Sequence, residues 1–279
     1  RPGSDDFRGQ FGRAQDIEWA LEGERLWLLQ SRPITTLGAR PDPDGARRIF
    51  DNSNIAESYG GVTTPLRHIW FGLMRLPEGL LSTRKGTAIK LDLLLDEAEK
   101  RALELVRQAS PDMPEAQQQA VARAVGIGAV KYADLSQNPQ SAVSFTWEKA
   151  LAMDGNSAPY LQYAYARIAS VLDKHAERFP GHDWCAAPLV LDSPHARRLA
   201  LRLARYSGAV CAAAAQEKPS LLADALYDLS QAYSSFYQNV PFLKAEAGLR
   251  ESRVRLCALT AKVLRHGLGL LGIETPDRI

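Results

Sequence analysis

Apolar residues recur every three or four positions along most of the chain after Gly86, with Glu, Lys and Arg between them. This spacing places the apolar side chains on one face of an α-helix and the charged side chains on the other. Because each such helix must bury its apolar face, the sequence predicts a mainly α-helical fold built as a helical bundle. The predicted helices cover residues 91–110, 114–135, 157–176, 193 onward, 220–239 and 249–266.

Residues at several predicted helix ends support these boundaries. Ser193 and Pro194 stand in the N-cap and first-turn positions that helix starts favour. Gly267 follows the last periodic residue as a C-cap candidate. The Gly126-Ile127-Gly128 sequence lacks the third glycine of a dinucleotide-binding loop, so it predicts a close contact between helices.

The first 37 residues follow a different pattern. Apolar and polar residues alternate over 16–22 and 26–32, and Gly23 lies in the turn between them, which predicts a β-hairpin. Because a lone hairpin is marginally stable in water, we expect this one to be a small N-terminal α/β remnant of a larger sheet. Residues 38–48 contain two glycines and two prolines without periodicity, which is typical of a linker.

The composition excludes a chain that is disordered, collagen-like or coiled-coil as a whole. The 279 residues correspond to about two domains at roughly 150 residues each, and the 46% apolar and 24% charged fractions are those of a globular chain. No apolar stretch reaches the roughly 18–20 residues that span a bilayer, and no leader pattern opens the chain, so we expect a cytoplasmic protein with no membrane contact. We also expect a monomer. The three cysteines lack metal-ligand or disulfide spacing, so no metal site is expected at Cys185, Cys211 and Cys257.

The net charge of +2 is too small to indicate a nucleic-acid or membrane partner, but the charge is unevenly distributed. Residues 158–279 hold 15 Lys and Arg against 11 Asp and Glu. Four arginines in this part lie at helical spacing, which gathers most of them on one side. A solvated basic face is the favoured interpretation and a phosphate-contacting stripe the alternative for Arg197, Arg198, Arg202 and Arg205.

Three groups of residues are candidates for binding or chemistry. In the loop 82–86, Arg84 and Lys85 are adjacent and a glycine follows, which suits a phosphate whose charge changes during a reaction, although basic turns are also common on surfaces. Tyr160, Tyr163 and Arg167 are spaced by three and four, so they share a helix face that would stack on unpaired bases or pack in a core.

The third group lies on the hairpin. Gln30 and Arg32 are two residues apart and therefore point to the same side of their strand, and Glu18 lies on the polar side of the partner strand. A carboxylate, an amide oxygen and a guanidinium group on one face would hold Mg²⁺ and a nucleotide phosphate. Polar residues on a solvated sheet face have the same pattern, and this alternative is favoured on the pattern alone.

Residues 71–95, FGLMRLPEGLLSTRKGTAIKLDLLL, resemble the signature loop of arginyl-tRNA synthetases, which are class I enzymes. Residues 125–135, 154–167, 226–242 and 270–278 resemble that family's C-terminal half in the same order, so the resemblance covers about 67–279. It implies ATP and Mg²⁺ as cofactors and tRNA(Arg) as the partner. It also implies that Arg84 and Lys85 are catalytic residues contacting ATP phosphates and that the tRNA is bound by Tyr160, Tyr163, Arg167 and Tyr237.

The signature loop departs from the family in one respect. Leu80 and Leu81 stand where a Lys-Met pair is often found, so the loop lacks its first basic residue. The resemblance implies a class I core end with this loop over 67–157 and an α-helical anticodon-binding domain over 158–279.

Residues 15–35, QDIEWALEGERLWLLQSRPIT, resemble the end of the ATP-grasp domain of phosphoenolpyruvate synthases and pyruvate phosphate dikinases, and 50–66 resemble the segment that follows it. This resemblance implies that Glu18 and Gln30 match metal ligands and that Arg32 matches a phosphate contact. It assigns 1–37 to a remnant of that domain and 38–66 to a linker segment. The two resemblances meet abruptly at residues 66–67, as expected of a truncated or chimeric reading frame.

These observations leave three hypotheses. The first is a C-terminal fragment of an arginine–tRNA ligase that binds tRNA(Arg); it is not expected to form arginyl-tRNA alone, because the core with the HIGH motif is not found before residue 67. The second is an ATP-dependent phosphotransferase related to phosphoenolpyruvate synthase. The third is an inactive chimeric product.

Overall fold

A computed structural model describes residues 90–279, except 182 and 186. Between Gln15 and Leu80 it describes the backbone of six strands. Side chains are described in the former range only. The chain divides into two compact units, one formed by residues 1–49 and 59–67 and the other by residues 50–58 and 68–279. The linker 38–48 and the loop 82–86 lie outside the described residues.

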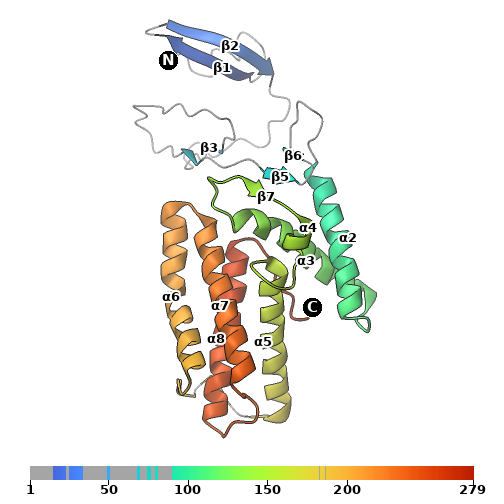
Figure 1. Ribbon diagram of the computed structural model, residues 1–279, viewed down its shortest axis with the longest axis vertical. Helices are drawn as coiled ribbons and strands as arrows, with labels where there is room; N and C mark the ends of the chain where they lie inside the picture. Colours follow the sequence, from blue (N-terminus) through green and yellow to red (C-terminus); the bar gives the residue numbers. More distant parts are fainter. Residues whose placement is uncertain are drawn as a thin grey trace. The chain divides into compact units, whose positions relative to one another are not determined.

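Helices dominate the second unit, so the prediction of a mainly α-helical fold is confirmed for the described part of the chain. Figure 1 shows α5, α6, α7 and α8 running alongside one another and α2 beside α3. The helices are α2 (Leu91–Ala109), α3 (Glu115–Leu135), α4 (Trp147–Ala150), α5 (Ala158–Arg178), α6 (Pro194–Gln216), α7 (Pro219–Asn239) and α8 (Leu249–Leu270). None of the described helices has both the length and the apolar content needed to cross a membrane.

Serine N-caps fix where α5 and α6 begin. The Ser157 hydroxyl oxygen accepts a hydrogen bond from the backbone N–H of Tyr160 at 3.3 Å, and that of Ser193 accepts one from Ala196 at 3.1 Å. Each bond satisfies an N–H group that has no partner within the helix. One predicted end is wrong: Gly267 lies inside α8, which continues to Leu270. Packing accounts for this glycine, because a Cβ atom there would lie 2.5 Å from the Leu226 side chain of α7.

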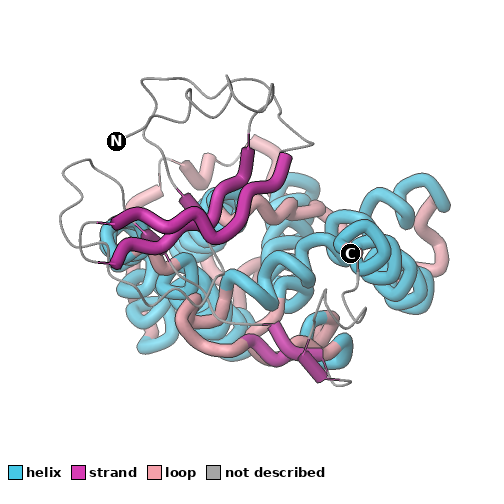
Figure 2. The backbone as a smooth tube through the Cα atoms, turned by 90° about the horizontal axis from the view of Figure 1, so that it is seen from above, coloured by secondary structure: helices cyan, strands magenta, loops and turns pink. Residues whose placement is uncertain are grey.

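The strands are short outside the hairpin. Strand β1 (Gln15–Glu22) pairs antiparallel with β2 (Arg25–Pro33), as the alternation predicts, and Figure 2 shows them as a two-stranded ribbon. In the second unit β5 (Met74–Leu76) pairs antiparallel with β6 (Gly79–Leu80) and parallel with β7 (Val143–Ser144). Two further two-residue strands are β3 (Ile49–Phe50) and β4 (His68–Ile69).

Two apolar cores lie within the helical unit. The larger one is formed mainly by α5–α8 and contains fully buried residues such as Leu161, Ile168, Phe236 and Leu264. The smaller one is formed by α2, α3 and the segment around α4. The buried Gln162 side chain joins these parts, because its Nε2 donates to the carbonyl oxygen of Ala124 on α3 at 3.1 Å and to that of Glu274 in the C-terminal tail at 2.7 Å.

The N-terminus of α8 contains a buried carboxylate whose charge should contribute to stability. Burial opposes ionisation of Glu251, but hydrogen bonds from the Arg250 side chain and from the backbone N–H of Gly248 outweigh it and lower the pKa of this carboxyl to about 2. The His175 Nε2 lies 3.9 Å from the same carboxylate. Because the folded-state pKa is depressed, the stabilisation is complete above the ordinary pKa of about 4.5 and is lost as the pH falls toward 2.

We therefore expect Glu251→Gln to lower the free energy of unfolding at pH 7 and to bring the variant closer to the unchanged protein as the pH falls from 5 to about 2. Urea unfolding followed by circular dichroism at several pH values measures both effects. A difference between the two proteins that stays constant over this range would contradict the role assigned to the charge.

Candidate nucleic-acid interface

The predicted tRNA-binding residues come together on one surface of the helical unit. Tyr160, Tyr163 and Arg167 lie on one face of α5, and this face meets α7, which carries Tyr237. A fifth residue, Tyr227 of α7, completes the set. We call these five residues, Tyr160, Tyr163, Arg167, Tyr227 and Tyr237, the tyrosine face.

Arg167 holds the centre of one half of this face. Its guanidinium carbon lies 4.8 Å from the ring centre of Tyr163 and 4.7 Å from that of Tyr237. These distances are those of cation–π contacts, so the charge is in contact with an aromatic ring from each helix. Arg167 Nη2 also donates a 2.8 Å hydrogen bond to the Tyr163 hydroxyl. The three side chains therefore hold one another in place.

Tyr160 and Tyr227 form the other half. Their rings meet edge to face with centres 5.9 Å apart. The Tyr160 hydroxyl shares a 3.1 Å hydrogen bond with Ser234, and Gln231 donates to the Tyr227 hydroxyl at 2.6 Å. The α7 side of the face is thus lined with groups that can donate and accept hydrogen bonds.

The tyrosines of the tyrosine face are more exposed to solvent than the tyrosines of the core. Tyr163 is 36% exposed, and the other members of the tyrosine face are partly exposed. By contrast, Tyr132 and Tyr233 are fully buried, and burial raises the pKa of both phenols. The interpretation of Tyr163 as a core residue is therefore wrong, whereas the packing and binding interpretations coexist for the partly buried rings. Binding by these residues remains a prediction.

Aromatic packing beneath the face supports the position of Tyr237. Its ring lies 5.5 Å from that of Phe242, which in turn packs edge to face on Phe236 at 5.0 Å. Phe236 is fully buried and Phe242 is 8% exposed. The Tyr237 ring is thus anchored to the larger core on one side and presented to Arg167 on the other.

Sequence reasoning missed three α7 residues of this surface, Tyr227, Gln231 and Ser234. Their spacing of four and three places them on one helix face, and this signal was available in the sequence. The spacing alone does not show which face of α7 packs against α5, because that depends on how the two helices pack in the folded protein.

The remaining predicted site residues are described less fully. Arg84 and Lys85 lie outside the described residues. On the hairpin, Glu18 stands directly opposite Gln30, and Arg32 lies two positions further along β2, opposite Asp16. This register agrees with the predicted placement of Glu18, Gln30 and Arg32 on one sheet face, and their side chains are outside the described set.

Known proteins match most of the chain. Residues 161–279 match the family model described as DALR anticodon binding domain, and residues 48–147 match that of the tRNA synthetases class I (R) catalytic domain. The second match begins before the predicted junction at 66–67 and so includes the segment 50–66. Both matches begin after the hairpin.

Individual relatives give the same result. The chain is 45% identical over 216 residues to an arginine–tRNA ligase of Proteus mirabilis, which covers 77% of this chain and 37% of the relative. It is 46% identical over 210 residues to that of Laribacter hongkongensis, covering 75% and 36%. The solved arginyl-tRNA synthetase of Thermus thermophilus superposes with a TM-score of 0.69 at 32% identity, covering 77% of this chain and 36% of that one.

The chain thus spans little more than a third of the length of these curated relatives. Four residues of the tyrosine face, Tyr163, Arg167, Tyr227 and Tyr237, lie within the region matched by the anticodon binding domain, and Tyr160 lies immediately before it. The chain therefore contains a class I (R) tRNA synthetase catalytic-domain segment over residues 48–147 and a DALR anticodon binding domain over residues 161–279, and it is similar to arginine–tRNA ligases over about three quarters of its length.

Proposed function

We propose that the helical part of this chain binds tRNA(Arg) by its anticodon loop and that the tyrosine face is the contact surface. The observation that carries the proposal is the Arg167 guanidinium held against the Tyr163 and Tyr237 rings in a segment that matches an anticodon binding domain. The exposed ring of Tyr163 adds a surface on which a base can stack.

The chemistry of the face suits an unpaired RNA loop. Sequence-specific RNA recognition mostly targets loops whose bases are splayed out, stacked on aromatic rings or Arg planes, and hydrogen-bonded on their edges. Tyr163 and Arg167 offer the stacking surfaces. In the other half of the face, Gln231 contacts Tyr227 and Ser234 contacts Tyr160, and their amide and hydroxyl groups can bond base edges.

This binding would serve the ATP-dependent formation of arginyl-tRNA through an arginyl-adenylate. The support is the similarity to arginine–tRNA ligases and the match of residues 48–147 to the class I catalytic domain. In that reaction the family resemblance assigns Arg84 and Lys85 to the ATP phosphates, with Mg²⁺ as the accompanying ion. The proposed setting is the cytoplasm, and the proposed state is a monomer.

The hairpin keeps a separate origin in this proposal, as part of a remnant of an ATP-grasp domain over residues 1–37. Its support is the register that sets Glu18 opposite Gln30. The alternative function, an ATP-dependent phosphotransferase, is not favoured, because the relatives that match about three quarters of the chain are arginine–tRNA ligases.

The test compares two tRNA transcripts that differ only in the anticodon loop. We expect the full chain to bind the transcript with an arginine anticodon more tightly than the one with a changed loop. Because base–aromatic stacking contributes about 1–3 kcal/mol per base, Tyr163→Leu should weaken binding of the first transcript by about 5- to 150-fold and remove the preference. Filter binding or fluorescence anisotropy measures both affinities.

Tyr163→Phe is the matched control. It keeps the ring and removes only the hydroxyl that accepts the hydrogen bond from Arg167, so most of the preference should remain. Equal affinity of the unchanged chain for the two transcripts would refute the proposed function.

A further inference from the structure

We propose that three arginines of α6, Arg198, Arg202 and Arg205, form a second RNA contact that binds the backbone phosphates flanking the anticodon loop. This inference rests on the proposed function, since it extends the binding surface from the tyrosine face across α7 to α6. We call these three residues the arginine row.

Helix geometry places the row on one side of α6. Positions 198, 202 and 205 are separated by four and three residues and therefore share a face, whereas Arg197 lies about 100° away from Arg198. Arg197 has a local role, because its Nε donates a 3.0 Å hydrogen bond to the carbonyl oxygen of Leu191 in the loop before the helix. The predicted group of four arginines is thus divided into one loop anchor and a row of three.

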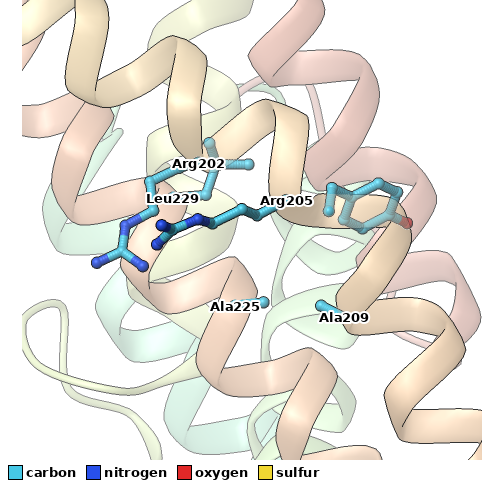
Figure 3. A pocket seen from close by; sticks show the side chains of 6 residues that line it. Arg202, Arg205, Ala209, Ala225 and Leu229 are labelled. Atoms are coloured by element: carbon cyan, nitrogen blue, oxygen red, sulfur yellow. The ribbon is translucent and has the colours of Figure 1, made fainter.

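The row borders α7. Arg202 Nη1 lies 2.8 Å from the Asp228 carboxylate, an ion pair that joins the two helices. Arg202 and Arg205 also line a shallow depression with Ala225 and Leu229 of α7, and Figure 3 shows both guanidinium groups extending in the same direction. Arg198 and Arg205 are exposed, and Arg202 is partly exposed.

The charge of this surface is only partly balanced. α6 contains four arginines and neither Asp nor Glu over its 23 residues. On the facing helix, Asp228 pairs with Arg202, and the pKa of the nearby Asp224 is raised by burial and then by Asp228. Within the described part of the chain, no salt bridge is found for Arg198 or Arg205. These two guanidinium groups therefore remain available to an anion.

The arginines contribute little to the stability of α6 itself. None of the arginines lies in the last turn of α6, where the helix dipole would favour a cation. No described Glu or Asp on α6 offsets them at a spacing of three or four. For Arg198 and Arg205, which have neither a loop contact like that of Arg197 nor an ion pair like that of Arg202, an external anion is the better explanation.

The position of the row fits one continuous RNA ligand. On α7, Tyr227 belongs to the tyrosine face, while the next residue, Asp228, contacts the arginine row. The tyrosine face and the arginine row therefore both border α7. Because the axes of packed helices lie about 8–10 Å apart, the distance between the two surfaces is on the order of one helix diameter. An RNA loop stacked on the tyrosines can place its flanking phosphates over α6, where guanidinium groups are suited to bind them in bidentate fashion.

Salt dependence of tRNA binding tests the proposal with the full chain. Each phosphate contact contributes about 0.7–0.9 to the slope of log affinity against log salt concentration. Arg198→Gln combined with Arg205→Gln should therefore reduce the magnitude of this slope by about 1.4–1.8, and it leaves the Arg202–Asp228 ion pair intact. Both transcripts should lose affinity by the same factor, so the anticodon preference should persist.

Two control proteins separate a phosphate contact from a general charge effect. Arg107→Gln combined with Arg123→Gln removes the same charge from exposed positions on α2 and α3, and its slope should stay unchanged. Arg198→Lys combined with Arg205→Lys keeps the charge and should keep most of the slope. Circular dichroism melts confirm that all variants are folded.

The outcomes distinguish this inference from the proposed function. An unchanged slope in the double Gln variant, or an equal loss in the α2–α3 control, overturns the arginine row even if the anticodon preference holds. A reduced slope in a chain that binds both transcripts equally would retain the row as a phosphate contact and refute anticodon recognition.

Discussion

Replacing Phe236 by alanine is expected to lower the free energy of unfolding by about 3–5 kcal/mol, which is typical of a large-to-small change in a packed core. Phe236 is 0% exposed and packs edge to face on Phe242 with ring centres 5.0 Å apart. Its removal forfeits the burial of the ring and leaves a cavity that the surrounding helices can fill only in part. Urea unfolding of the full chain, followed by circular dichroism at 222 nm, measures the change.

Leu270→Ala is the control for Phe236→Ala. Leu270 is a large apolar residue in α8, but it is 53% exposed, so its truncation should change stability by no more than about 0.5 kcal/mol. A loss at Phe236 as small as that at Leu270 would show that the aromatic cluster is not part of a close-packed core.

The Phe236 variant should also affect the binding surface. Phe242 packs against Tyr237 at 5.5 Å, and Tyr237 holds one side of the Arg167 guanidinium. A looser Phe242 lets the Tyr237 ring move, so we expect weaker tRNA binding even under conditions where the variant is folded. Core packing and the presentation of the tyrosine face are therefore linked through a single chain of aromatic contacts.

Much of the helical fold follows from local pattern. The starts of α5 and α6 could be predicted because a serine N-cap and a nearby proline act on the same few residues. The end of α8 could not, because Gly267 is a C-cap candidate by sequence, whereas in the structure it lies inside the helix where a Cβ atom would meet Leu226, 41 positions earlier in the chain. The strands β5–β7 have two or three residues each, which is too short for a period of two to show.

The candidate site likewise has some features that local sequence predicts and others that depend on contacts between helices. Tyr160, Tyr163 and Arg167 could be found because one helix face carries all three. The cation–π contact with Tyr237 could not be derived from spacing, because it depends on how α5 and α7 pack. The arginine row is an intermediate case: spacing gathers the arginines on one side of α6, but only the contact with Asp228 shows that this side borders α7.

The second large effect is expected at Gly126, where α3 passes close to α2. A Cβ atom at this position would lie 2.6 Å from the Ala98 carbonyl oxygen and 2.8 Å from the Glu99 backbone nitrogen. Both are backbone atoms of a packed helix, so neither can move aside without separating the two helices. We expect Gly126→Ala to destabilise the protein by about 3 kcal/mol, near the upper end of the range for overpacking.

Gly208→Ala provides a control with the same chemical change. Gly208 also lies inside a helix, but no atom lies within 4 Å of the position its Cβ would take. Alanine should therefore stabilise α6 by about 0.5–1 kcal/mol, because it reduces the conformational freedom lost on folding. The expected shifts in the urea midpoint are thus of opposite sign for one substitution made in two helices.

The opposite signs isolate the contact between α2 and α3. Helix propensity favours alanine over glycine at both positions, so it cannot produce destabilisation at one and stabilisation at the other. Only the close approach of the Ala98 backbone to Gly126 distinguishes them. If both variants are more stable than the unchanged chain, α2 and α3 do not approach as closely as described. The prediction of a tight helix contact at Gly126-Ile127-Gly128 would then be wrong as well.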